Sequence, residues 1–197
     1  MVYDNKLKQV SKVAVFIDNS NVFKIIQYLR KSDPKWISLY DPLKLAEKLV
    51  GNRNLAYVGF YCVQPPSYLL GEDEWHIKIY KITQKYYSEI EKMPLVHVKY
   101  GNLRGPKGSL QEKNVDTQLA TDMVAMAATG AYNTAIIVSN DGDYESAVNL
   151  VKNTFGKKVE VVFFKGRLSM NLEKSCDVKR RARRSFFELL DFDKNTF

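Results

Sequence analysis

Short apolar runs alternate with amphipathic segments along this chain, and that alternation limits the possible folds more than any other feature. Residues 13–17, 55–63, 95–100, 134–138 and 158–164 are rich in β-branched and aromatic side chains, which is typical of strands. Helical patterns fill most of the intervals, at 22–30, 42–50, 72–93, 114–129 and 143–154. The alternation predicts an α/β fold, a three-layer α/β/α sandwich around a mostly parallel sheet of five or six strands.

The C-terminal part, residues 165–197, has a less regular pattern. It contains a helical segment at 168–176, a basic run at 179–184 and an apolar run at 186–190 that is either a sixth strand or a short helix. No internal repeat or domain boundary is visible. We therefore expect one domain over 10–192, with a basic segment at 177–185 and short tails at 1–9 and 193–197.

Composition favours a polyanionic partner and argues against several site chemistries. The formal net charge is +8, which suits nucleic acid, although basic proteins with other roles are common. Cys62 and Cys176 match no zinc or redox spacing, and His76 and His97 are too isolated for zinc or Ser-His-Asp chemistry. With no signal-like N-terminus and no apolar run near the ~18 residues of a membrane span, we expect a cytoplasmic protein.

Acidic side chains follow two of the expected strands and begin one of the expected helices. Asp18 comes directly after the first strand, and Asp141 and Asp143 follow the fourth. Asp116 lies in the first turn of the helix that leads back into the fourth strand. Because ligands bind at the carboxyl edge of open parallel sheets, we expect these four carboxylates to converge there.

Clustered carboxylates predict a divalent cation. Two like charges ~4 Å apart repel by about 1 kcal/mol in water and by about 4 kcal/mol near a protein surface, and a bound cation removes that cost. Oxygen ligands without histidine or cysteine favour Mg²⁺ or Mn²⁺ over zinc. Such an ion can generate a hydroxide nucleophile and neutralise the charge that develops on a phosphodiester.

Each acid also has a structural explanation. Asp18, Asp141 and Asp143 could cap helices, and Asp116 could complement a helix dipole. Four acids at one edge beside a basic loop nevertheless favour the metal interpretation. Asp122 is left out of the predicted site, because it lies about 120° around the helix from Asp116, at the border of the apolar face.

Three blocks of sequence resemble the NYN-domain, or LabA-like, branch of the PIN-like nuclease superfamily. They are VAVFIDNSNVF at 13–23, KNVDTQLATDMVAMA at 113–127 and IIVSNDGDYESAVNLVKNTFGKKVEVV at 136–162, in the order and spacing of the family. The resemblance covers residues 10–165. It implies a PIN-like fold and a ribonuclease that cleaves single-stranded or structured RNA with Mg²⁺ or Mn²⁺.

The resemblance also assigns roles to residues. Its metal-binding acids fall on Asp18, Asp116, Asp141 and Asp143. Asn21 falls at a polar position that could orient water or phosphate in the catalytic site. The turn after the fourth strand usually reads Ser-Gly-Asp-Gly-Asp-Phe, and here Asn140 and Tyr144 replace the first Gly and the Phe. PIN-like proteins often dimerise, so a homodimer is among the expected states.

Two sets of basic residues are candidates for contacts with RNA. The first is the run Lys179, Arg180, Arg181, Arg183 and Arg184, which could be a backbone clamp, a nuclear-import signal or a solvated face. We favour the clamp. The second set lies in an expected polar loop at 101–113 and could steer phosphates toward the metal: Arg104, Lys107 and Lys113. Tyr100 and Tyr144 could stack bases, although such residues more often pack in a core.

Other functions remain in competition with a nuclease. The strongest is an RNA-binding or scaffold protein whose PIN-like site binds metal but cuts poorly. A phosphatase of the haloacid-dehalogenase type would need a second Asp two residues after Asp18, where this chain has Ser20. A receiver-like signalling domain would pair two acids after the first strand, but Asn19 follows Asp18.

Overall fold

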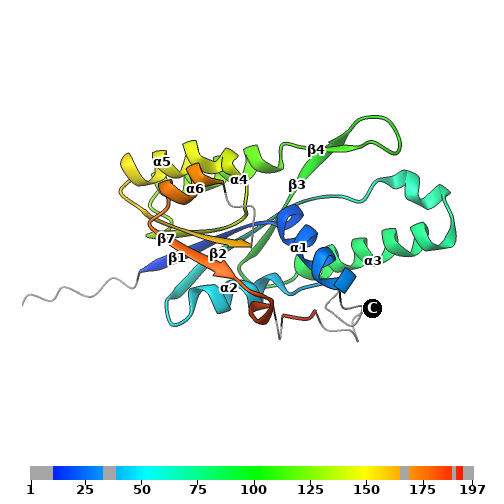
Figure 1. Ribbon diagram of the computed structural model, residues 1–197, viewed down its shortest axis with the longest axis horizontal. Coiled ribbons are helices and arrows are strands. Elements are labelled where there is room, and N and C mark those ends of the chain that lie inside the picture. The colour runs from blue at the N-terminus through cyan, green and yellow to red at the C-terminus, as the bar shows by residue number, and fades with distance from the viewer. Residues whose placement is uncertain (1–10, 33–38, 165–168, 188–189, 193–197) are drawn as a thin grey trace, which may run out of the picture.

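The computed structural model describes residues 11–32, 39–164, 169–187 and 190–192, which form a mixed α/β fold (Figure 1). The strands are β1 (Lys12–Asp18), β2 (Asn54–Val63), β3 (Val96–Arg104), β4 (Gln111–Lys113), β5 (Thr134–Val138), β6 (Lys158–Phe164) and β7 (Val178–Ala182). The α-helices are α1 (Asn19–Ser32), α2 (Pro42–Val50), α3 (Glu74–Ile90), α4 (Val115–Ala128), α5 (Glu145–Asn153) and α6 (Met170–Ser175). Short 3₁₀ helices are η1 (Ser67–Gly71), η2 (Gly142–Tyr144) and η3 (Arg184–Phe186).

The strands form one sheet in the order β4-β3-β2-β1-β5-β6-β7. All neighbouring strands are parallel except β3 and β4, which are antiparallel. The chain builds the sheet outward from β1 through β2 and β3, and then returns to β5 on the other side of β1. This reversal creates a switch point at the carboxyl ends of β1 and β5, where parallel α/β sheets bind ligands.

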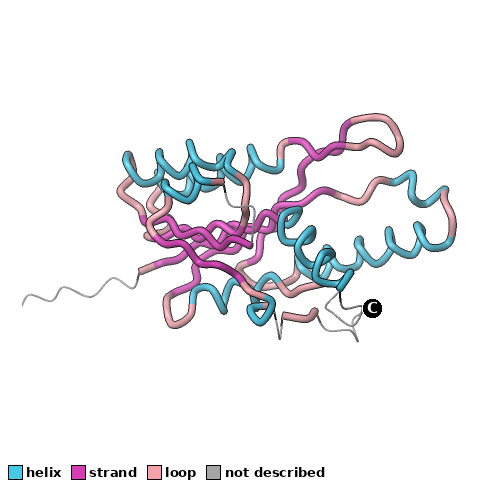
Figure 2. Tube along the Cα trace, in the orientation of Figure 1, coloured by secondary structure: helices cyan, strands magenta, loops and turns pink. Residues whose placement is uncertain are grey.

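Side chains that alternate along β1 separate two hydrophobic clusters. Val13, Val15 and Ile17 belong to one cluster, with buried residues of α1, α2 and α3. Ala14 and Phe16 belong to the other, with buried residues of α4, α5 and α6. Figure 2 shows helices on both sides of the strands. Burial on both faces explains why the central strands are apolar without interruption.

Local signals in the sequence set several helix ends. The Asp41 carboxylate accepts hydrogen bonds from the backbone N–H groups of Leu43 and Lys44, and Pro42 begins α2, as predicted. Gly130, at φ 70°, follows α4, as expected for a residue that ends a helix. Among the residues that the structure describes, no helix combines the length and apolar character needed to cross a membrane.

The prediction of a polar loop at 101–113 is wrong, because β3 and β4 form a hairpin over this segment. β3 continues to Arg104, and β4 pairs with it, Asn102 opposite Lys113. A Cβ added at Gly101 would lie 2.7 Å from the Lys113 carbonyl oxygen, so only glycine fits this close crossing. The hairpin projects beyond the main sheet (Figure 1), which explains why it lacks the apolar pattern of a buried strand.

Most of the basic run at 179–184 forms an edge strand of the sheet. β7 pairs in parallel with β6, with Arg180 beside Val162 and Ala182 beside Phe164. β4 and β7 raise the strand number to seven, above the five or six expected. The apolar run at 186–190 is not a strand in its described part: η3 ends at Phe186, and Phe187 and Leu190 are buried in the first cluster. Residues 188–189 and both predicted tails, 1–9 and 193–197, lie outside the described residues.

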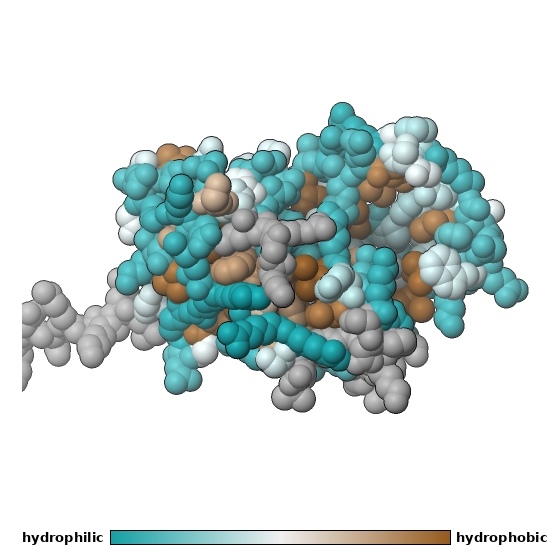
Figure 3. Space-filling view, viewed as in Figure 1, coloured by the Kyte–Doolittle hydropathy of each residue, from teal (hydrophilic) through white to brown (hydrophobic). Residues whose placement is uncertain are grey.

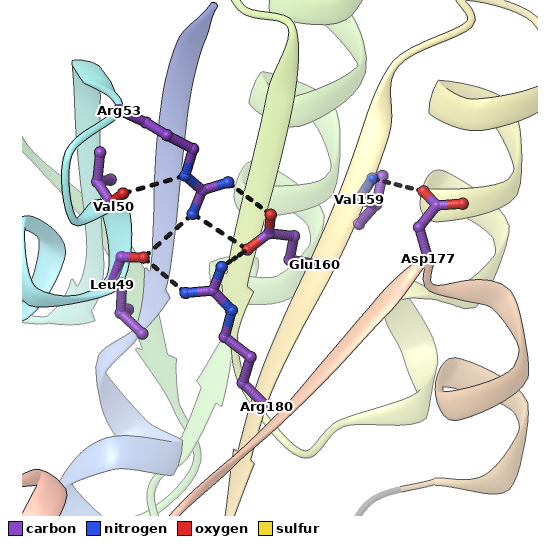
Figure 4. Close-up of polar contacts among 7 residues, drawn as sticks. All are labelled: Leu49, Val50, Arg53, Val159, Glu160, Asp177 and Arg180. Carbon is purple, nitrogen blue, oxygen red and sulfur yellow. Dashed lines mark hydrogen bonds and ion pairs between the residues drawn. The ribbon is translucent and has the colours of Figure 1, made fainter.

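Arg180 belongs to a partly buried ion cluster that joins the edge strand β7 to α2 (Figure 4). Its guanidinium pairs with the buried Glu160 carboxylate at 2.6 Å and donates to the Leu49 carbonyl at 2.7 Å. Arg53 pairs with the same carboxylate at 2.5 Å and donates to the carbonyls of Leu49 and Val50. The two arginines thus satisfy carbonyls at the C-terminus of α2, which have no partner within the helix.

Replacing Glu160 tests the contribution of this cluster to stability. Glu160→Gln removes the negative charge between two half-buried guanidinium groups and should lower the free energy of unfolding by about 2 kcal/mol. Glu89→Gln is the matched control, because Glu89 pairs with Lys92 at the surface and such pairs contribute at most about 1 kcal/mol. Chemical denaturation measures both, and equal effects would contradict a structural role for the cluster.

Candidate functional site

Asp18 ends β1 as a fully buried carboxylate surrounded by hydrogen-bond donors. Its Oδ1 accepts from the Ser20 hydroxyl at 2.8 Å and from the Asn21 backbone N–H at 3.2 Å. Its Oδ2 accepts from the Asn21 side-chain amide at 2.5 Å and from the Ser139 hydroxyl at 2.9 Å. The donors come from the start of α1 and the end of β5, so the carboxylate fixes the two segments that meet at the switch point.

Tyr144 connects Asp18 to Asp116. Its hydroxyl oxygen lies 2.8 Å from Oδ1 of Asp116 and 3.2 Å from Oδ2 of Asp18. The ring is fully buried against the second cluster, which holds the hydroxyl in place. Because the hydroxyl carries only one proton, the two carboxylates share it. The structure therefore brings these two predicted site residues together, although they are far apart in the sequence.

Asp116 is the acid of this pair that faces solvent. Partial burial of its carboxylate raises the pKa, the hydrogen bond from Tyr144 opposes the rise, and the negative charges of the other three predicted acids add to it. The sum raises the pKa of Asp116 above its usual range. Repulsion among the four acids is therefore felt at Asp116, as expected for a site with excess negative charge.

Asp141 and Asp143 lie in the turn after β5. The Asp141 carboxylate accepts from the backbone N–H of Asp143 at 3.1 Å, so Asp141 caps η2, the structural role that its residue type suggested. Asp143 is exposed. Between them, Gly142 packs so closely that an added Cβ would lie 2.5 Å from the Ser169 hydroxyl oxygen. The turn therefore holds both acids near Asp116, but the Tyr144 hydroxyl hydrogen-bonds to Asp18 and Asp116 and not to them.

Glu112 is a site residue that the sequence reasoning missed. It lies on β4, and its carboxylate is close enough to Asp18 and Asp116 for their charges to raise its pKa. Partial burial of the carboxylate is the largest cause of that rise, while hydrogen bonding with Ser20, whose proton Asp18 also accepts, and the charge of Lys24 oppose it. No motif marks Glu112, and its only signal in the sequence is a position four residues before Asp116.

The side chains of the acids at this edge suit a hard divalent cation, since every ligand atom that they offer is a carboxylate oxygen. In the described part of the chain, however, no three Asp, Glu, His or Cys side chains already lie together in a group that could hold a metal ion. Asp122 lies apart from the other acids: it accepts from the Tyr61 hydroxyl at 2.9 Å and lies 3.7 Å from the Lys99 ammonium.

The predicted basic residues lie in two places. Arg104, Lys107 and Lys113 are exposed on or between the strands of the β3–β4 hairpin, and Lys107 pairs with Glu72. Exposed Lys179, Arg181, Arg183 and Arg184 are on β7 or just beyond it. Arg180 faces Glu160 and α2 instead. Of the two aromatic candidates for base stacking, Tyr144 is buried, and the Tyr100 hydroxyl donates to Glu91.

Residues 12–181 match the NYN domain family, a match that spans most of the chain. A solved protein of unknown function from Vibrio parahaemolyticus is similar in fold, with a TM-score of 0.59 and 18% identity. The alignment covers 94% of this chain and 99% of that one. At this identity the likeness shows the fold alone. No curated protein matches the chain.

Removing the Tyr144 hydroxyl tests the link between the acids. Because the hydrogen bond from Tyr144 lowers the pKa of Asp116, Tyr144→Phe should raise that pKa further, as measured by the pH dependence of the carboxyl ¹³C chemical shift. Tyr132→Phe is the matched control, since the buried Tyr132 hydroxyl donates to the carbonyl of Met123, which is on α4 like Asp116. Each variant loses about 1 kcal/mol of stability. An Asp116 titration that is the same in both variants would contradict the shared hydroxyl.

Proposed function

This chain belongs to the NYN domain family, and from that membership we propose that it is a ribonuclease of the LabA-like branch that uses Mg²⁺ or Mn²⁺. The observation that carries the proposal is the Tyr144 hydroxyl between Asp18 and Asp116, at the switch point of a parallel sheet. Asp18, Asp116, Asp141 and Asp143 would hold the cation. When bound, the ion lowers the pKa of a water molecule and neutralises charge on the phosphodiester.

The acids differ in what each can do. Asp18 is buried and held by four side chains, so it supplies a fixed negative charge at the base of the site. Asp116 faces solvent with a raised pKa, so a cation would relieve its repulsion from the other acids, and its carboxylate is open to substrate. Asn21, whose amide orients Asp18, is a positioning residue that aligns this carboxylate.

RNA would cross the edge of the sheet between two basic regions. Through the strand pairings, Arg181 lies at the level of Asp18, three strands away, at about 14 Å for ordinary strand spacing. Arg181, Arg183 and Arg184 form the proposed clamp on this side, and the basic residues of the hairpin flank the acids on the other. Arg180 is left out, because Glu160 and the Leu49 carbonyl engage its guanidinium.

The second candidate is an RNA-binding protein that cuts poorly. It is favoured by the hydrogen bonds that already satisfy Asp18 and by the absence, in the described residues, of three acids grouped for a metal. Such a protein would keep the basic regions and bind the same strands. Cleavage therefore decides between the two functions, and binding alone does not.

Asp116→Asn tests the nuclease. Single-stranded RNA should be cleaved with Mn²⁺ and not with EDTA, and the variant should reduce kcat on the order of a hundredfold or more. Asp122→Asn is the matched control, because Asp122 is also on α4 and also accepts a tyrosine hydroxyl. It lies outside the acid cluster, which consists of Asp18, Asp116, Asp141 and Asp143. Binding without cleavage by the unaltered protein would favour the scaffold, and cleavage that survives both EDTA and Asp116→Asn would point to another site.

Salt dependence tests the clamp. Replacing Arg181, Arg183 and Arg184 with Gln removes three phosphate contacts, so the slope of log K against log salt for single-stranded RNA should fall in magnitude by about 2. A control of equal charge lies at the amino ends of the parallel strands. Lys12 begins β1, and Lys157 and Lys158 lie at the start of β6. A slope that is unchanged by the arginine replacements would reject the clamp.

A further inference from the structure

A largely apolar hollow of about 450 Å³ opens beside the acid cluster. Its walls come from the start of α1, the carboxyl end of β2 with Pro65 and Pro66, η1, α3 and the β3–β4 hairpin. Figure 3 shows hydrophobic atoms reaching the surface in the part of the molecule between the hairpin and α3. The volume lies in the range of roughly 300–1,000 Å³ that is usual for small-molecule sites.

The hollow and the acid cluster share a wall. Ser20 lines the hollow, and its hydroxyl donates to Asp18 at 2.8 Å. Glu112 lines it as well, and its carboxylate interacts with both Asp18 and Asp116. A group that occupied the hollow would therefore be next to a phosphate that a cation bound by the acids would hold.

Side chains around the hollow suit a flat, partly polar ring. Phe23 is 38% exposed although it is a large hydrophobic residue, and the Tyr68 ring lies on another wall. Aromatic faces stack on nucleobases of any sequence, and polar groups at the rim can contact base edges. The Lys107 ammonium, which also pairs with Glu72, lies 5.4 Å from the centre of the Tyr68 ring and places positive charge at this wall.

We propose that this hollow binds one unstacked nucleobase of single-stranded nucleic acid, next to the phosphate at the acid cluster. Phe23 and Tyr68 provide the stacking surfaces, and Ser20 and Glu112 set the distance between the base and the acids. The proposal rests on the proposed function for its choice of substrate class. It adds that one base of the bound strand must leave its stack, which a double-stranded substrate permits only after unpairing.

The test is a binding measurement that needs no catalysis. Single-stranded oligonucleotides with 2-aminopurine at successive positions are titrated with the protein in Ca²⁺, a hard cation that can join carboxylate and phosphate oxygens, and in EDTA for comparison. A base that enters the hollow changes its fluorescence because it leaves its neighbours and contacts aromatic rings. We expect one position to respond and its neighbours to respond weakly. An abasic residue at that position should weaken binding by about tenfold or more.

Two opposite variants and one control identify the hollow. Phe23→Ala removes a stacking surface, and Thr83→Trp fills the hollow from α3; both should abolish the fluorescence response and the abasic penalty. Trp75→Ala is the control, because Trp75 is an exposed aromatic residue of α3 that does not line the hollow. Circular dichroism confirms that each variant is folded.

The outcomes separate this inference from the proposed function. If Asp116-dependent cleavage occurs but no position responds, or if the variants respond as the unaltered protein does, the hollow is not a base site and the nuclease stands. If a base response occurs without cleavage, the hollow stands and the nuclease does not. Free nucleoside monophosphates that bind as tightly as the oligonucleotide would instead show a small-molecule site and overturn the proposal.

Discussion

The burial of a carboxylate at the end of the central strand constrains the segments around it. Asp18 has no exposed surface, and an isolated charge in such a place would cost several kcal/mol without hydrogen bonds. Donors to it come from the start of α1, from the end of β5 and from Tyr144 at the end of η2. These segments must all place a donor at the two carboxylate oxygens of Asp18, which fixes α1, β5 and η2 relative to β1. Tyr144 also donates to Asp116, so the same arrangement holds Asp116 near Asp18.

The parts of the fold that the sequence predicted are those governed by strong local patterns. The apolar strands, the Asp41 cap of α2 and the helix that begins before Asp116 each follow from burial on two faces, from capping or from helical spacing. The hairpin and β7 were missed because neither contributes the apolar pattern of a central strand. β7 is an edge strand with only Ala182 buried, and its register is set by tertiary contacts such as the Arg180–Glu160 pair.

For the candidate site, the sequence indicated which acids share an edge but not how they are held. Strand ends and helix starts place acids near a switch point whatever their contacts. The bridging hydroxyl of Tyr144 could not be foreseen, since a tyrosine in a helical pattern is usually a core residue. Tyr144 occupies a position where the NYN family usually has phenylalanine. Asn140 occupies a position of a usual glycine, and its side-chain oxygen accepts a hydrogen bond from the Phe164 backbone N–H at 2.8 Å. Both departures have partners that lie far away in the chain.

Both outer strands of the sheet carry charge on exposed positions. β4 consists of Gln111, Glu112 and Lys113, and the exposed residues of β7 include Lys179 and Arg181. Free strand edges invite another chain to add a strand, and charged side chains discourage that addition. Two copies of this protein are therefore not expected to join their sheets into one continuous structure. Arg181, considered above for contact with phosphate, therefore has a second consequence, because its charge on β7 discourages the addition of a strand from another chain.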